Sequence, residues 1–227
     1  MSPIAIITGA SRGIGRAIAL RLSNDHDIVA VARSVEELDR LAQEIHARGG
    51  SCRPCVLDIT NPEAVDEKLS GIEADVLVNN AGVGWVKPFM DLTRAEWTQM
   101  VDVNFNALFD VTRAVLPGMM ARKRGHVIVT GSIAGRSAFV GGTCYAATKH
   151  AVMAFTECLM LEVRDSGVKV SVVSPGSVAT GFSSGADASW KLAPSDVAEA
   201  VANVIATPPN VLVHRLEVRT LTVPKKK

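Results

Sequence analysis

Short runs of β-branched and apolar residues alternate with longer stretches of helical pattern along the chain. The strand-like runs are IAIITG, DIVAVA, CRPCVLD, ADVLVN, HVIVTGS and VKVSVVSPG, with a last one around residues 211–218. This alternation is typical of βαβ units, in which parallel strands are covered by helices on both faces. We therefore expect an α/β fold built on a doubly wound parallel sheet of about seven strands.

Helical patterns fill the intervals between these runs. We expect helices over residues 16–22, 35–47 and 63–69, and a long helix over residues 93–122 that is kinked at Pro117. A further helix is expected over residues 145–164, and another starts near Ser195. No linker, repeat or change in composition interrupts the pattern, so we expect a single domain, residues 1–227.

The charge balance narrows the classes of partner. Lysine and arginine number 24 and aspartate and glutamate 23, which gives a formal net charge of +1. Without an excess of one sign there is no bulk attraction for phosphate backbones or anionic bilayers, so no nucleic acid and no membrane partner is expected. The start, MSPIAIITGASRG, lacks the pattern of a secretory signal, and no run of about 18 apolar residues occurs. We expect a cytoplasmic protein.

The four cysteines are expected to be reduced thiols in that compartment. Cys52 and Cys55 form a C-x-x-C, but residues three apart on a strand point to opposite faces, which suits neither a disulfide nor a shared metal ion. The five histidines show no H-E-x-x-H or similar spacing. No metal site is expected.

A glycine-rich turn follows the first strand-like run and opens a helix. The unpaired backbone N–H groups at a helix start favour an anionic group, and glycines let the backbone approach a pyrophosphate closely. No Gly-Lys-Ser/Thr follows, which excludes a P-loop. The turn therefore predicts a dinucleotide-phosphate site that includes Thr8, Gly9, Ser11, Arg12, Gly13, Ile14 and Gly15.

The end of the second strand-like run indicates which dinucleotide binds. A domain that binds NAD usually has an acidic residue there, whereas this chain has Arg33 after Ala32. Arg33 and Arg12 suit the 2′-phosphate of NADP, which a guanidinium can bind bidentately with no carboxylate to repel it; alternatively, both are ordinary solvated charges. Asp58, which precedes Ile59, either accepts from the adenine amino group or caps the helix that begins near residue 61.

Six motifs carry a resemblance to a known family. They are TGASRGIG at residues 8–15, NNAG at 79–82, Asn104 within VNFNA, Ser132, YAATK at 145–149 and PGSVAT at 175–180. Together, and in this order, they resemble the short-chain dehydrogenase/reductase family, which has a Rossmann-type fold. The resemblance implies that Ser132, Tyr145 and Lys149 are catalytic, that Asn104 supports a proton relay, and that Asn80, Ala81, Gly82, Pro175, Gly176, Val178 and Thr180 line the cofactor site along with Ile59.

The residues themselves are consistent with those roles. Tyr145 and Lys149 are four apart and so share one helix face, and an ammonium beside a phenol would lower the phenol pKa from about 10 toward neutral pH. Tyr145 would then act as general acid or base while a hydride passes between the nicotinamide and a carbonyl or secondary alcohol, and the Ser132 hydroxyl would hold the substrate oxygen. No G-x-S-x-G surrounds Ser132, which excludes a serine hydrolase elbow. A non-catalytic NADP-binding sensor or scaffold stays the alternative of another class.

The C-terminal part bears on the substrate. APSDVAEAV followed by PPNVLVHRLEVR resembles the NADP-dependent dehydrogenases of serine and other 3-hydroxy acids, and the Asp-Gly-Gly segment typical of 3-oxoacyl thioester reductases is absent. A small 3-hydroxy acid is the expected substrate, with a 3-oxoacyl thioester as the alternative. Arg136 or Lys191 is the expected cation for a carboxylate, and Phe182 and Trp190 are the expected apolar walls.

The helix after Lys149 predicts self-association. HAVMAFTECLMLEV has apolar or small residues on almost every side, more than a helix needs to cover one sheet. The extra face, with Met153, Leu161 and either Met160 or Phe155, predicts subunit contact, and the family resemblance implies a homodimer or homotetramer.

Overall fold

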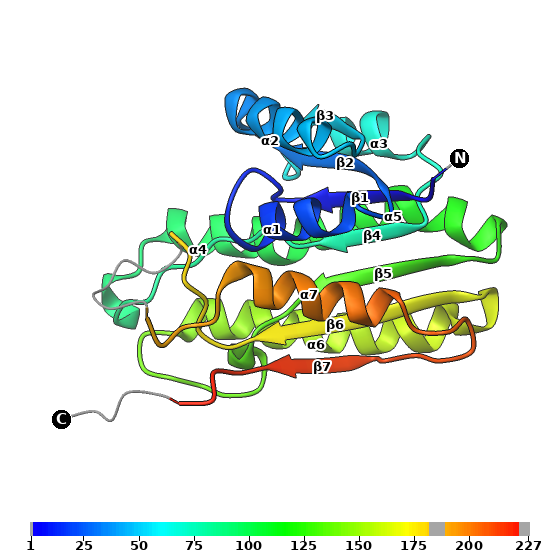
Figure 1. Cartoon of the computed structure of the whole chain (residues 1–227). Helices are drawn as coiled ribbons and strands as arrows, with labels where there is room; N and C mark the ends of the chain where they lie inside the picture. The colour runs from blue at the N-terminus through cyan, green and yellow to red at the C-terminus, as the bar shows by residue number, and fades with distance from the viewer. Residues whose placement is uncertain (1, 182–188, 223–227) are drawn as a thin grey trace.

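The computed structural model describes residues 2–181 and 189–222. Its seven strands form one parallel sheet in the order β3-β2-β1-β4-β5-β6-β7, shown in Figure 1. The expected doubly wound parallel sheet is confirmed. The strands are β1 (Ile4–Thr8), β2 (Asp27–Ala32), β3 (Cys52–Val56), β4 (Val76–Asn79), β5 (Gly125–Thr130), β6 (Val168–Pro175) and β7 (Arg215–Val218).

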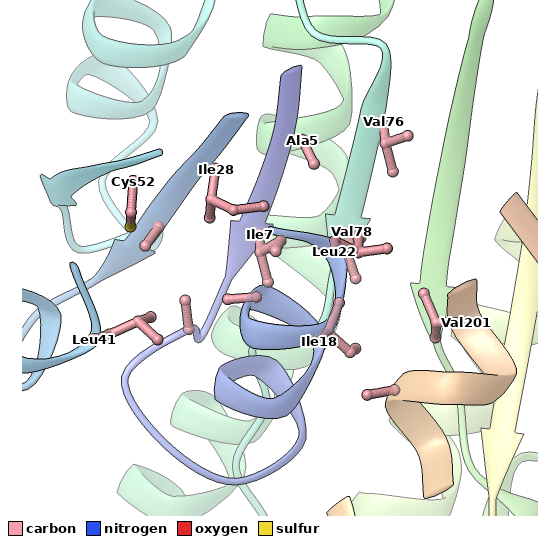
Figure 2. Close-up of a cluster of buried hydrophobic side chains, with 14 of the residues drawn as sticks. Ala5, Ile7, Ile18, Leu22, Ile28, Leu41, Cys52, Val76, Val78 and Val201 are labelled. Atoms are coloured by element: carbon pink, nitrogen blue, oxygen red, sulfur yellow. The ribbon is translucent and has the colours of Figure 1, made fainter. Parts of the chain in front are cut away.

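Two hydrophobic cores lie on the two faces of the sheet, because successive side chains of a strand point to opposite sides. Along β1, Ala5 and Ile7 enter the first core, and Ile6 enters the second. Figure 2 shows the first core, where Ile18 and Leu22 of a helix pack near these strand residues. Helices α1 (Gly13–Leu22), α2 (Val35–Ala47) and α7 (Pro194–Ile205) cover that face, and α3 (Pro62–Leu69), α5 (Ala107–Ala121) and α6 (Thr143–Val163) cover the other.

Strand order reverses between β1 and β4. The chain runs outward from β1 to β3 and then returns to build β4 to β7 on the other side, so the loops that leave β1 and β4 diverge. All seven strands are parallel and therefore end at the same edge of the sheet, as Figure 1 shows. In folds of this kind ligands bind at that edge, beside the reversal.

The expected long helix over residues 93–122 is not uniform. It begins as α4 (Arg94–Val101), which a capping box between Thr93 and Glu96 starts, passes through a π-helical turn at Asp102–Asn106, and continues as α5. Helix α5 continues through Pro117, and the sequence did not predict the π-turn, where the hydrogen bonding changes. Such turns are frequent at functional sites.

The structure contradicts one residue of the predicted subunit contact on α6. Met153 is 8% exposed and packs inside this chain, where the Ser174 hydroxyl contacts its sulfur at 3.7 Å. Phe155 and Met160 are partly buried against the second core, and Leu161 is 53% exposed. Only Leu161 of the four named side chains is therefore largely available to a partner. Within the described ranges, no helix has both the length and the apolar character needed to cross a bilayer.

Candidate active site

A cleft of about 800 Å³ lies at the carboxyl ends of the strands. The turn after β1 and the loops after β2 to β6 line it, and it is wide enough for a dinucleotide with a small substrate beside it. Most residues that the sequence singled out line this cleft. They are Gly9, Ser11, Arg12, Gly13, Ile14, Arg33, Asp58, Ile59, Asn80, Ala81, Gly82, Ser132, Tyr145, Lys149, Pro175, Gly176, Val178 and Thr180.

Thr8, Gly15 and Asn104 lie behind the cleft lining and shape it from there. The Thr8 hydroxyl accepts hydrogen bonds from the backbone N–H groups of Asn80 (3.0 Å) and Ala81 (3.1 Å). A side chain at Gly15 would place a Cβ 2.3 Å from the carbonyl oxygen of Gly9, so this position admits only glycine without a shift of the backbone. Thr8 therefore anchors the loop that follows β4 against the end of β1. Gly15 lets helix α1 pack closely against the turn that follows β1.

The turn after β1 fits a pyrophosphate. Gly9 has a φ of +67°, in the left-handed region that favours glycine, and a Cβ there would lie 2.9 Å from the Ala81 Cα. Helix α1 starts after Arg12, whose guanidinium has no acceptor for capping N–H groups, and the first turn of the helix has no carboxylate. The N–H groups at this helix start are thus left for an anion.

Arg33 and Asp58 lie together at the β3 side of the cleft. The Arg33 Nη1 is 3.9 Å from the Asp58 Oδ2, and both side chains are exposed. The expectation that no carboxylate lies near Arg33 is therefore wrong. Hydrogen bonds from the Thr60 backbone and hydroxyl, with help from Arg33, lower the pKa of Asp58. Asp58 does not cap α3, because the Asn61 side chain does so by accepting from the Ala64 N–H at 3.0 Å.

The structure brings Ser132, Tyr145 and Lys149 together. Ser132 follows β5, and its side chain is hydrogen-bonded to that of Tyr145 on the first turn of α6. The buried Lys149 lies one turn later, with its Nζ 6.0 Å from the centre of the Tyr145 ring. Its ammonium donates to the Thr130 carbonyl oxygen at 2.9 Å, and burial lowers the pKa of Lys149 to about 8.

The pKa of Tyr145 is raised, not lowered as we expected. Burial disfavours the phenolate, and the hydrogen bond with Ser132 offsets only part of this effect. The Lys149 ammonium donates to the carbonyl oxygen of Thr130, which is the last residue of β5. Burial therefore favours the protonated form of the Tyr145 phenol.

Asn104 joins two sides of the site from within the π-turn. Its Oδ1 accepts from the Val83 N–H at 2.8 Å, and its Nδ2 donates to the Val83 carbonyl at 2.8 Å and to the Thr148 hydroxyl at 3.1 Å. The Thr148 hydroxyl donates to the Tyr145 carbonyl at 2.8 Å. The side chain of Asn104 thus ties the loop after β4 to the turn of α6 that carries Tyr145.

The structure separates the predicted substrate residues. Trp190 and Lys191 line the cleft, and Phe182 lies outside the described residues. Arg136 is absent from the described cleft lining, and its Nη1 lies 3.4 Å from the Glu217 Oε1. Sequence reasoning missed Val86 and Phe139, two lining residues from irregular segments. No periodic pattern marks such positions, and a single aromatic residue before a helix is a weak signal.

Comparisons with known proteins agree with this geometry. The family model for short chain dehydrogenase matches residues 3–189. The NADP-dependent 3-hydroxy acid dehydrogenase YdfG of Salmonella typhi is 36% identical, over 96% of this chain and 95% of the relative. The structure of the closed form of serine dehydrogenase complexed with NADP+ has a TM-score of 0.89 and 32% identity, with 99% of each chain covered.

A 3-oxoacyl-[acyl-carrier protein] reductase from Brucella melitensis has a similar fold, with a TM-score of 0.88, 28% identity, and 96% of this chain and 90% of that chain covered. The resemblance seen in the motifs therefore extends over the sheet and the cleft. Matched over most of its length, the chain belongs to the short-chain dehydrogenase family.

Proposed function

We propose that the chain is an NADP(H)-dependent oxidoreductase that interconverts a carbonyl compound and an alcohol, with Tyr145 as general acid and base. The observation that carries this proposal is the hydrogen-bonded pair of Ser132 and Tyr145, which lies beside Lys149 in the same cleft as the glycine turn. When bound, NADPH supplies the hydride and NADP accepts it.

The cleft residues suit NADP in particular. The turn at Gly9 and the start of α1 leave room and N–H groups for the pyrophosphate, and Arg12 and Arg33 line the same cleft. A guanidinium can bind the 2′-phosphate through two charge-assisted hydrogen bonds. Asp58, whose pKa is lowered, would accept from the adenine amino group.

The protein groups would act on the substrate oxygen as follows. In reduction, the protonated Tyr145 phenol donates its proton to the carbonyl oxygen, while the Ser132 hydroxyl hydrogen-bonds the same oxygen as negative charge develops there. The Lys149 ammonium would donate hydrogen bonds to the ribose of a bound cofactor and would stabilise the phenolate that remains. In oxidation the phenolate takes the alcohol proton. Because burial raises the pKa of Tyr145, the protonated phenol required for reduction is the form that the cleft favours.

We propose a small 3-hydroxy acid, or its 3-oxo form, as the substrate. The names of the YdfG and serine dehydrogenase relatives support this class, as does Lys191 in the cleft lining. The Brucella melitensis reductase keeps the 3-oxoacyl thioester as the alternative.

The test is a substrate panel. NADP reduction with 3-hydroxy acids and NADPH oxidation with 3-oxoacyl thioesters would be followed by absorbance of the reduced nicotinamide. Turnover of the acids above that of the thioesters supports the proposal, and the reverse order supports the alternative. Binding of NADPH without turnover of either panel would indicate the sensor or scaffold.

Replacement of Arg33 tests the NADP preference. Arg33→Ala is expected to weaken NADP binding by about 10- to 100-fold and to leave NAD binding nearly unchanged, because it removes charge-assisted bonds to the 2′-phosphate. Arg40→Ala is the matched control, since Arg40 is also exposed but pairs with Glu37 on α2. Fluorescence titration gives both dissociation constants. Equal losses for NADP and NAD would contradict the assignment.

Replacement of Asn104 tests its positioning role. Asn104→Ala is expected to lower kcat by about 100-fold while changing NADP affinity far less, because loss of the Val83 and Thr148 bonds lets Tyr145 shift. Asn106→Ala is the control, since Asn106 lies in the same π-turn but bonds only Asp102 at the surface among the described residues. An unchanged kcat for Asn104→Ala would exclude this role.

A further inference from the structure

One side of the cleft next to the proposed catalytic residues is apolar. Val86, from the loop after β4, and Phe139, from the segment between β5 and α6, both line the cleft that holds Ser132 and Tyr145. Val86 is 63% exposed and Phe139 is 42% exposed, so both side chains have apolar surface left to contact a bound molecule. We call these two side chains the apolar wall.

Phe139 is held against the start of α6. A Cβ added to Gly142 would lie 2.5 Å from the Phe139 Cζ, so the ring occupies the space above this glycine. The Gly142 N–H also donates to the Phe139 carbonyl at 3.1 Å. Gly142 is the N-cap of α6, three residues before Tyr145. The ring is thus positioned from the same helix start as the proposed proton donor.

Val86 is held by a contact between the two loops. The Lys87 N–H donates to the Gly141 carbonyl at 3.1 Å, and a Cβ at Gly141 would lie 3.2 Å from the Val86 Cγ1. Gly141 has a φ of +81°, which few other residues adopt. The Lys87 ammonium binds Glu96 at 2.6 Å and anchors this loop to α4. Both parts of the apolar wall are therefore fixed by bonds outside the cleft.

The charged residues of the cleft also bear on which substrate binds. Among the described lining residues the one carboxylate is Asp58, which follows β3 and is separated from Ser132 by the intervening strands β2, β1 and β4. The lysines of the described lining are Lys149 and Lys191. A substrate carboxylate thus meets cations, whereas a substrate ammonium meets no described carboxylate near Tyr145.

On the basis of the proposed function, we propose that the apolar wall binds an uncharged apolar substituent beside the reacting carbon. The preferred substrates are accordingly 3-hydroxy acids with a methyl or larger apolar group, rather than amino-substituted ones such as serine. An ammonium group against Val86 and Phe139 would lose hydration without gaining a counter-ion from either side chain, while a methyl group gains contact there.

A matched pair of substrates tests this proposal. Serine and 3-hydroxy-2-methylpropanoate differ in having an ammonium or a methyl group on C2, and each enantiomer of both would be assayed with NADP. We expect kcat/KM for the better enantiomer of the methyl compound to exceed that for serine by about tenfold or more. Phe139→Ala and Val86→Ser are each expected to lower the value for the methyl compound by about tenfold and to change that for serine by less than about twofold.

Val140→Ala is the matched control, because Val140 is 97% exposed beside Phe139 and is absent from the described cleft lining. Val140→Ala should leave kcat/KM for both substrates unchanged, and NADP affinity should stay constant in all three variants. A wild-type preference for serine, or a substrate ratio that neither cleft variant alters, would overturn the apolar wall but leave the proposed function intact. Turnover of neither compound nor of any other 3-hydroxy acid would overturn both.

Discussion

Tyr145→Phe is expected to reduce turnover by about a thousandfold or more, because it removes the proposed proton donor and leaves no substitute. Tyr145 is the one tyrosine in the sequence. The ring stays in place, so NADP affinity should change by less than about threefold. The change in turnover then measures the loss of the phenol hydroxyl alone. Steady-state turnover and a fluorescence titration with NADPH would check the two parts separately.

His150→Ala is the control for this experiment, since His150 is exposed on the same helix and its ring nitrogen bonds the Ala146 carbonyl. It should keep near-normal turnover. If Tyr145→Phe retained more than about a tenth of wild-type turnover, another group would have to supply the proton. A parallel loss of NADPH binding would instead indicate a structural fault in the variant.

Acid is expected to destabilise the fold through His126, at the amino end of β5. This side chain is 5% exposed, and its Nε2 lies 2.8 Å from the Ser171 hydroxyl oxygen on β6. Burial, with a smaller contribution from the Lys169 ammonium, lowers the pKa of His126 to about 3. In the unfolded chain the pKa is about 6.5, so between these two values the unfolded state binds a proton that the folded state does not.

The difference between the two pKa values sets the direction of the pH dependence. The free energy of unfolding rises with pH across the window from about 3 to about 6.5, and stability is lost as pH falls through it. From this group alone, we expect stability near pH 4.5 to be about 3 kcal/mol below that near pH 7. Urea unfolding at the two pH values measures the effect.

His126→Gln should remove most of this pH dependence, because glutamine can still bond Ser171 but does not titrate in this range. His150→Gln, at an exposed position, should leave the pH dependence as it is in the wild type. An equal loss of stability in acid for wild type and His126→Gln would show that other groups cause the effect. Should His126→Gln be too unstable to measure near pH 4.5, the slopes of the wild type and the variant between pH 5 and 6.5 give the same comparison.

The sheet could be predicted from sequence because its strands are short, strongly apolar and separated by clear turn residues. The predicted bounds of the strand at Asp27–Ala32 and the helix at Val35–Ala47 agree with the structure, and the Ser34 hydroxyl caps that helix by accepting from Glu37. The family resemblance implied the grouping of Ser132, Tyr145 and Lys149, whereas spacing alone predicted only that Tyr145 and Lys149 share a helix face.

Other features depend on tertiary contacts that local patterns do not encode. The π-turn around Asn104 is stabilised by bonds to Val83 and Thr148, which are distant in sequence. The raised pKa of Tyr145 results from burial in the folded cleft. Asp58 reaches Arg33 because β2 and β3 pair in parallel register, and Val86 and Phe139 meet the cleft through irregular loops.

The π-turn also constrains how this segment could be recombined with that of a relative. An extra residue in a helical turn rotates everything that follows by about 100°, because an α-helix has about 3.6 residues per turn. The side chains of Val111 and Val115, which follow the turn in α5, lie in the second core, so removing a residue from the turn would rotate them away from that core. A chimera should therefore exchange residues 94–121 as one block, because a junction inside the turn would misalign either Asn104 or the apolar face of α5.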